Sequence, residues 1–261
     1  MKKALTIGGC TIGFLLISAL VIFIFFPGLP TYIKVKHDYD HIDELVPEFE
    51  KTEVPSDFVS RSLKGVSFSI PSDWEGSSPI EGREASTYKS GKEYGIFVLT
   101  TDYKELAKLQ EEYKDMLSDQ YDESDLYDPW EYYKYKEADY RHFYKTIGVD
   151  LPQYGLSSTM VFYTRDCLTA KNCLKLRGKD KDVFLSLAED KEKAVGIENM
   201  WKTKISGFNA YIGQEIYAGY NGNLWIATIF PDDTPNKVYT VTLNCPDETM
   251  ARQIISSVEL E

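Results

Sequence analysis

The chain has 261 residues, a formal net charge of −12 and an aromatic content of 14%. So acidic a chain repels phosphate backbones, which argues against nucleic-acid binding. Binding to anionic lipid headgroups is disfavoured for the same reason, apart from a short flank that contains Lys34 and Lys36. Without its apolar N-terminal segment, the chain is long enough for one sizeable domain or two small ones.

An apolar segment follows the basic head Met1-Lys2-Lys3 and occupies residues 4–26. It has no charged residue, and 14 of its 23 residues are Leu, Ile, Val or Phe. A helix of this length crosses the ~30 Å hydrocarbon core of a bilayer. A basic head before an apolar run is typical of secretory signals, and this layout places residues 1–3 in the cytoplasm. The sequence thus predicts a single-pass cell-membrane protein with an extracytoplasmic C-terminal domain.

Cleavage of this segment as a signal peptide is the alternative. Ser18 and Ala19 offer a weak site for a signal peptidase, but cleavage there would leave the apolar residues 21–26 on the mature chain. The apolar region of a signal peptide is also usually shorter, at ~7–15 residues. A transmembrane anchor that stays attached is the favoured interpretation.

The first part of the predicted soluble region combines a spacer, strands and a helix. Residues 27–62 are acidic and mixed, and we interpret them as a spacer. The alternation in residues 66–70 predicts a half-buried strand, and residues 95–100 are apolar on both faces, as in a central strand. Asp102 and Glu105 form a capping box that opens a helix. The apolar stripe of that helix consists of Leu106, Leu109, Tyr113 and Met116.

The middle of the chain, residues 119–200, is predicted to be a helical insertion. Asp128 followed by Pro129 is a typical helix start, and we expect a helix from there to Ile147. Residues 157–195 are charged and also favour helix. Their predicted buried set is Leu174, Leu176, Val183, Phe184, Leu187 and Ala188.

Strand patterns return in the last quarter of the chain. Asn221-Gly222 is a strong hairpin signal between the first two of three predicted strands, which are residues 211–217, 224–230 and 238–243. A closing helix follows Pro246-Asp247. The pattern predicts an α+β fold for residues 63–261, an α-β-α sandwich in which helices cover an antiparallel sheet.

Two short motifs resemble those of PsbP-like domains. Ser69-Ile70-Pro71-Ser72-Asp73-Trp74 resembles their opening strand, proline and tryptophan, and Ile254-Ile255-Ser256-Ser257-Val258 is similar to their closing helix. The order of strands and helices is similar too, over about residues 63–118 and 205–261. The resemblance implies an α-β-α sandwich with a non-enzymatic accessory or binding role. It carries over no functional residues, and the helical insertion departs from the pattern.

Three cysteines follow the apolar segment, at positions 167, 173 and 245. An odd number cannot all pair within the chain. Cys167 and Cys173 could close a small loop, but free, buried thiols are the favoured interpretation.

Two groups of residues could bind a metal ion. His37 and His41 are four residues apart and would share one face of a helix, as a metal site requires. A loop of four acids could supply oxygens to calcium, but it lacks the EF-hand spacing and its glycine: Asp122, Glu123, Asp125 and Asp128. A solvated spacer and a solvated capping loop are the favoured alternatives, so the sequence predicts no metal and no cofactor.

Catalytic motifs are equally weak. Ser86 and Lys89 match a Ser-x-x-Lys pattern, but the elements that accompany it in penicillin-binding proteins are missing. A Ser-His-Asp or Cys-His site would have to use His142, the last histidine of the chain. Acid–base chemistry by a carboxylate pair stays open, because the chain has 41 acidic residues. We therefore predict a protein without enzymatic activity.

A dense run of aromatic residues is the least ordinary feature of the insertion. It contains Tyr127, Trp130, Tyr132, Tyr133, Tyr135, Tyr140, Phe143 and Tyr144. Some of these must lie off a buried stripe, and exposed Tyr and Trp favour contacts with proteins or glycans. The predicted binding residues are Tyr127, Trp130, Tyr132 and Tyr135. In the alternative interpretation, the insertion buries most of these rings against the sheet.

Three functions agree with these features. The leading hypothesis is a non-catalytic extracytoplasmic domain that binds a protein, a peptide or a cell-envelope polymer through the insertion. The second is an envelope hydrolase that uses a carboxylate pair. The third is a small-ligand sensor, which would need an enclosed apolar pocket.

Overall fold

The computed structural model describes residues 21–22, 24–80, 83–88, 94–117, 130, 133–195, 198–215 and 224–261. The chain divides into two compact units, each assembled from segments that are distant in the sequence. The described residues of unit 1 fall within Met1–Leu45, Pro129–Leu151 and Tyr163–Lys193. Those of unit 2 fall within Val46–Asp128, Pro152–Phe162 and Ala194–Glu261.

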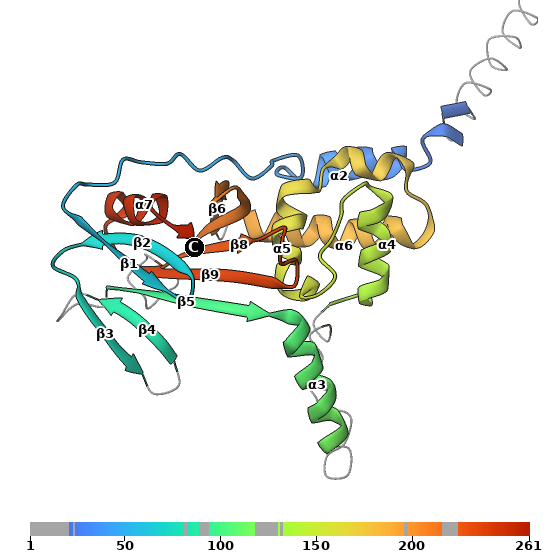
Figure 1. Ribbon diagram of the computed structural model, residues 1–261. Helices are drawn as coiled ribbons and strands as arrows, with labels where there is room; N and C mark the ends of the chain where they lie inside the picture. The colour runs from blue at the N-terminus through green and yellow to red at the C-terminus, as the bar shows by residue number, and fades with distance from the viewer. Residues whose placement is uncertain are drawn as a thin grey trace, which may run out of the picture. The chain divides into compact units, whose positions relative to one another are not determined.

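Unit 2 contains two antiparallel sheets, which confirms the predicted α+β class (Figure 1). The larger sheet comprises β3 (Glu75–Ile80), β4 (Arg83–Tyr88), β5 (Gly95–Asp102), β6 (Glu198–Ile205), β7 (Phe208–Glu215), β8 (Leu224–Phe230) and β9 (Lys237–Asn244). Its order is β3-β4-β5-β9-β8-β7-β6. The smaller sheet has the order β1-β2-β10 and comprises β1 (Phe58–Leu63), β2 (Val66–Pro71) and β10 (Glu259–Leu260). The helices α3 (Tyr103–Leu117) and α7 (Glu248–Ser256) belong to the same unit.

One apolar core joins the two sheets of unit 2. In β2 every second residue is buried, so Val66, Phe68 and Ile70 all face this core. On the larger sheet, Trp225 of β8 is opposite Leu243 of β9, and both are fully buried. Figure 1 shows α7 beside β2, where it closes the core. The buried residues of α7 are Ala251, Ile254 and Ile255.

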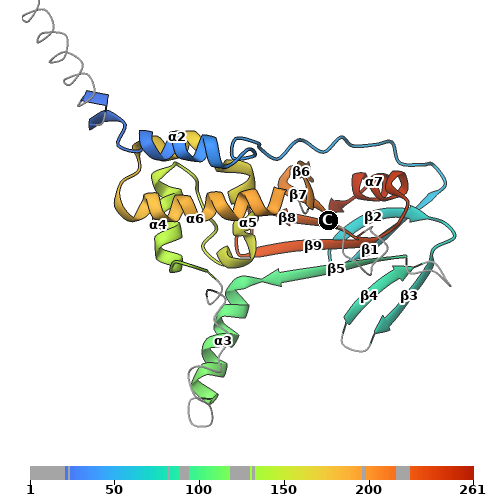
Figure 2. The ribbon, with the colours of Figure 1, turned by 180° about the vertical axis from the view of Figure 1, so that it is seen from behind.

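Unit 1 is helical, and its helices are visible from both sides in Figures 1 and 2. They are α2 (Leu29–Asp38), α4 (Glu137–Thr146), the 3₁₀ helix η2 (Ala170–Lys175), most of α6 (Gly178–Val195), and the last part of α5 (Leu156–Cys167). Gly28 brings α2 against η2: its N–H donates to the Leu174 carbonyl at 2.9 Å. A Cβ atom at residue 28 would overlap the Cys173 carbonyl oxygen, so this approach requires glycine.

The predicted spacer contains more structure than its composition indicated. Residues 29–38 form α2, in which Thr31 and Val35 are buried. Further along, Ile42 is 1% exposed and Phe49 is 6% exposed. An acidic segment can therefore contribute to the core when its few apolar residues lie on one side of the chain.

Two helix predictions need correction. The expected helix from Pro129 to Ile147 is wrong at its start, because α4 begins only at Glu137. Residues 133–135 form a bend, and Lys136 has an extended backbone. The apolar stripe expected on α3 is not buried where it is described: Leu106 is 43% exposed and Leu109 is 44% exposed.

The remaining predictions about the N-terminus and the hairpin fall largely outside the described residues. Within the described residues, no helix has the length and hydropathy needed to cross a bilayer. The predicted anchor lies outside them at residues 4–20 and 23, as does the Asn221-Gly222 turn. The strands that this turn was expected to join are β7 and β8, which pair antiparallel with Glu215 opposite Leu224.

Candidate functional site

An aromatic cluster lies in unit 1, where the chain approaches α4. It consists of Trp130, Tyr133, Tyr135 and Tyr140. The ring of Tyr140 is central: its centroid lies 5.6 Å from Trp130, in a stacked arrangement. Tyr133 and Tyr135 meet the same ring edge-on, at 5.8 Å and 6.1 Å. These distances and angles are those of favourable aromatic pairs.

The four rings of the aromatic cluster differ in exposure. Tyr140 is 1% exposed and belongs to the core of unit 1. Trp130, Tyr133 and Tyr135 are half-buried. A buried ring therefore holds three rings that each present part of their surface to solvent. Rings held in this way lose little conformational entropy when a partner covers them.

Ion pairs and hydrogen bonds fix α4 under the cluster. Lys179 of α6 contacts Asp139 of α4 at 2.7 Å, and this hydrogen bond lowers the pKa of the Asp139 carboxyl. The hydroxyl of Tyr144 is hydrogen-bonded to Thr164 Oγ1 at 2.7 Å. Burial raises the pKa of Tyr144, so this phenol stays neutral at every physiological pH. The contacts bind α4 to both α5 and α6.

Charges of both signs flank the aromatic cluster. Lys134 places its ammonium 5.7 Å from the centroid of the Tyr135 ring, within cation–π range. Partial burial raises the pKa of the Asp190 carboxyl. The negative charge of Asp190 in turn helps, after burial, to raise the pKa of Tyr140. The cluster thus combines apolar area with a cation, an anion and phenolic hydroxyls.

The structure brings together two of the four predicted binding residues. Trp130 and Tyr135 both contact Tyr140, whereas Tyr127 and Tyr132 lie outside the described residues. Tyr133 also belongs to the cluster, although it was not among the four predicted binding residues. The bend at residues 133–135 changed its position, and no propensity signal marks that bend.

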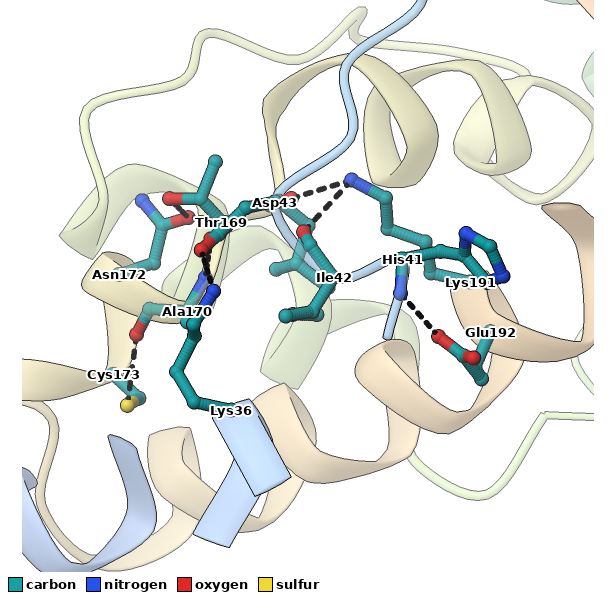
Figure 3. Close-up of polar contacts among 11 residues, drawn as sticks. Lys36, His41, Ile42, Asp43, Thr169, Ala170, Asn172, Cys173, Lys191 and Glu192 are labelled. Carbon is teal, nitrogen blue, oxygen red and sulfur yellow. Dashed lines mark hydrogen bonds and ion pairs between the residues drawn. The ribbon is translucent and has the colours of Figure 1, made fainter. Parts of the chain in front are cut away.

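A second group of polar contacts surrounds Lys191 and ties the segment after α2 to the rest of unit 1 (Figure 3). Lys191 is 1% exposed, and its Nζ donates to the carbonyls of Ile42 at 3.1 Å and Leu168 at 2.7 Å. Burial lowers the pKa of Lys191 to about 8. This contact could not be predicted from the sequence, because a single lysine in a charged helix is usually solvated.

The segment that accepts from Lys191 has further partners. The backbone N–H of His41 donates to Glu192 at 3.1 Å. The Asp43 carboxylate accepts from Lys36 and from the backbone N–H of Ala170, both at 2.8 Å. Burial opposes ionisation of Asp43, but these two contacts hold its pKa below the ordinary value. The group is thus satisfied internally, which fits a structural role for Lys191 rather than a nucleophilic one.

The histidines are engaged separately in the structure. Nδ1 of His37 is hydrogen-bonded to Asp38 at 2.9 Å, and Nδ1 of His41 is hydrogen-bonded to Glu44 at 3.0 Å. The bond with Glu44 raises the pKa of His41. Among the described residues, no group of three or more potential ligands could hold a metal ion. The acidic loop at residues 122–128 lies outside the described residues.

The three described cysteines are free, as the favoured interpretation expected. Cys173 and Cys245 are buried, and burial raises the pKa of each thiol to about 11. A thiol with so high a pKa is protonated at neutral pH and is a poor nucleophile. Cys167 is only half-buried.

Comparisons with known proteins give no relative from which a role could be carried over. No protein-family model matches the chain. No curated protein matches it either. A functional conclusion therefore depends on the geometry and chemistry of the residues themselves.

Proposed function

We propose that this protein is a single-pass membrane protein whose extracytoplasmic part binds a partner without catalysing a reaction. The partner is a protein, a peptide or a cell-envelope polymer. The contact surface is the aromatic cluster of Trp130, Tyr133, Tyr135 and Tyr140 in unit 1. One observation carries the proposal: three half-exposed rings are held around a fourth that is buried.

Aromatic side chains at a protein surface bind partners well for a physical reason. Each ring offers a large area and only two rotatable bonds, so covering it gains much contact for a small loss of entropy. Trp and Tyr are also the residues most enriched among those that dominate binding energy. Lys134 and Asp190 add polar groups at the margin, which favours a partner with its own hydrogen-bonding groups.

The proposed anchor rests on the apolar composition of residues 4–26 and on the exposure of the described residues near its end. Ile24 is 55% exposed and Phe25 is 67% exposed. Apolar side chains this exposed at the end of an uncharged segment are stable in lipid and unfavourable in water. For the same reason we place the protein at the cell membrane. The basic head before the apolar segment favours residues 1–3 inside and residues 31–261 outside.

We further propose that residues 63–261 form an α-β-α sandwich of PsbP-like type, with residues 119–200 as a helical insertion. The residues behind the resemblance have the burial that such a sandwich needs. Trp74 is 1% exposed, and it shares its core with Ile254 and Ile255 of α7. These contacts support the proposal at the level of fold and assign no site.

Photo-crosslinking tests the binding surface directly. A photoreactive phenylalanine analogue replaces Tyr135 in the full-length chain, and membranes that contain this protein are irradiated. Tyr154, which is half-buried in unit 2, is the matched control position. We expect discrete adducts, either protein bands or envelope polymer, from position 135 and not from position 154.

An alanine pair makes the same test without a probe. Tyr135→Ala should lower the retention of the crosslinked partner, which is the amount of it that stays bound to the protein during purification. We expect a loss of at least about ten-fold, as loss of a central aromatic contact causes. Tyr154→Ala should leave retention unchanged. Equal labelling from both positions, or unchanged retention by Tyr135→Ala with an unchanged melting temperature, would refute the aromatic cluster as a binding surface.

A further inference from the structure

Unit 1 carries a group of basic residues that contrasts with the acidity of the chain as a whole. We call this group the cationic rim; it consists of Lys34, Lys171, Lys175, Arg177 and Lys181. None of the five makes an ion pair with any residue that the structure describes. Other basic residues nearby differ in this respect, since Lys36 is paired with Asp43 and Lys179 with Asp139.

Tertiary contacts hold the cationic rim next to the end of the apolar segment. The 3₁₀ helix η2, which contains Lys171 and Lys175, packs against α2, which contains Lys34. Just after η2, the guanidinium of Arg177 donates to the Ile24 carbonyl at 3.1 Å. Residues about 150 positions apart in the sequence therefore meet at this end of unit 1.

Two acidic side chains close to the cationic rim have partners of their own. Asp43 accepts hydrogen bonds from Lys36 and Ala170. Asp180 lies 3.5 Å from His142 Nε2 and accepts a hydrogen bond from Thr146. These carboxylates are therefore less available to neutralise the rim, and its excess positive charge faces solvent.

Apolar side chains are exposed on the same elements. On α2, Thr31 and Val35 point inward, so Pro30, Ile33, Lys34 and His37 form the outward face at helical spacing. Ile33 is 61% exposed directly beside Lys34. Exposed aliphatic groups flanked by lysines characterise helices that lie in the headgroup region of a bilayer.

We infer that the cationic rim and the outward face of α2 dock on anionic lipid headgroups of the bilayer in which residues 4–26 are anchored. This inference rests on the proposed anchoring. Positive charge on the rim complements a negatively charged leaflet, and Ile33 enters the headgroup region. Docking would orient unit 1 at the membrane and leave the aromatic cluster, which is built on a different element, available to its partner.

Acetylation of lysines in the full-length protein tests the docking. The chain is reconstituted into lipid nanodiscs of phosphatidylcholine, with or without phosphatidylglycerol, and acetylation rates are measured by mass spectrometry. With the anionic lipid, we expect the rates of Lys34, Lys171 and Lys175 to fall at least about three-fold. Exposed Lys51 and Lys145 are internal controls whose rates should not change. Salt at about 1 M should remove the protection, since it shortens the Debye length to ~3 Å.

Charge reversal separates the rim from a general effect of lipid charge. Lys171→Glu combined with Lys175→Glu should abolish the protection of Lys34 in the anionic nanodiscs. The control, Lys51→Glu combined with Lys145→Glu, changes the net charge by the same amount. In this variant Lys34 should stay protected.

Each remaining outcome decides between the proposals. Insertion of the chain with equal acetylation rates in both lipids would overturn the docking and leave the anchor intact. Failure of the chain to enter either nanodisc would overturn the anchor and the docking together. Protection that requires an added acidic protein instead of anionic lipid would also overturn the docking, because the rim would then serve a protein partner.

Discussion

The interiors of the two units are made of different kinds of contact. The core of unit 2 is apolar from one sheet to the other, with Trp74, Phe68 and Trp225 among its largest members. The interior of unit 1 also contains groups that must be hydrogen-bonded, including Lys191 and the hydroxyls of Tyr144 and Thr164. An apolar core is stabilised by area and packing, whereas a polar interior depends on each partner being present.

This difference has a consequence for how each unit responds to change. Truncation of a side chain in unit 2 should cost free energy in proportion to the cavity it leaves. A change at Lys191 in unit 1 should instead act through charge and through the two carbonyls it leaves unpaired. The predictions below test that contrast, beginning with the largest expected effect.

Trp225→Ala should have the largest effect. The side chain is fully buried and stacks on Trp201 with the ring centroids 5.6 Å apart. Its Nε1 has no hydrogen-bond partner in the described part of the chain, so the loss is one of packing. We expect the free energy of unfolding to fall by about 3–5 kcal/mol, as measured by urea denaturation of the detergent-solubilised protein.

Leu99→Ala is the matched control on the same sheet. Leu99 is 42% exposed, so its truncation should cost less than about 1 kcal/mol. Hydrogen exchange of α4 in unit 1 should remain protected in the Trp225→Ala protein. Equal losses from the two variants would show that the core of unit 2 is not as continuous as its buried residues indicate.

Lys191 predicts a pH dependence that belongs to unit 1. Its pKa is about 8 in the folded chain against an ordinary value of 10.5, so folding disfavours its charged form. Below pH 8 the Lys191 amine holds its proton in both the folded and the unfolded chain, so the full free-energy cost of burying the charge applies. Between pH 8 and 10.5 only the unfolded chain holds it, and stability rises with pH by about 3 kcal/mol in total. The neutral amine still has two N–H groups for its two carbonyls.

Comparison with Lys191→Met isolates this effect from other groups that titrate in the same range. The measured quantity is the difference in free energy of unfolding between the two proteins, followed from pH 7 to pH 11. As pH rises, the original chain should become more stable relative to the Lys191→Met protein. A flat difference would mean that Lys191 keeps its ordinary pKa, and a difference of opposite sign would mean that an anion stabilises its charge.

The same contrast explains which parts of the fold could be predicted from the sequence. β2 was predicted because Val66, Phe68 and Ile70 alternate with polar residues. The edge strand β3 and its neighbour β4 were missed, because Glu75–Ile80 and Arg83–Tyr88 are mostly polar and small and show no such alternation. Their pairing is a property of the backbone, which the side-chain pattern does not encode.

The interior of unit 1 was harder to predict for a different reason. Lys191 donates to the carbonyl of Ile42, which is 149 residues away in the sequence, and no local pattern marks such a pair. For the candidate site, composition alone pointed to Trp130 and Tyr135. Tyr133 was missed because helical spacing was assumed through a segment that bends. Local periodicity thus predicts which side chains face a core. It does not predict long-range polar contacts or bends in the chain.

Arg252 is a charged residue of unit 2 that packs against aromatic rings. Its guanidinium lies over three rings, 4.9 Å from Trp201, 5.4 Å from Phe49 and 5.5 Å from Trp225. Arg252→Lys keeps the charge but loses the planar group that covers the rings. We expect a loss of about 1 kcal/mol in the free energy of unfolding.

Arg141→Lys in unit 1 is the control for Arg252→Lys. Arg141 also bonds a glutamate four residues earlier in its helix, Glu137, at 2.7 Å. Such partly exposed pairs contribute only about 0.3–0.5 kcal/mol, so this substitution should have less effect. If both substitutions cost the same, the rings around Arg252 add nothing to its ion pair with Glu248.

The last prediction concerns the start of α7, where the expected effect is no larger than that of Arg252→Lys. Asp247 accepts a hydrogen bond from the backbone N–H of Met250 at 2.9 Å and so caps the helix that closes the core of unit 2. Asp247→Ala should lower the free energy of unfolding by about 1 kcal/mol, and Asp247→Asn should restore most of it, because both Asp and Asn cap well. A loss that Asn does not restore would assign the effect to charge rather than to the cap. The cap is a local contact, and the sequence predicted it by placing a closing helix directly after Pro246-Asp247.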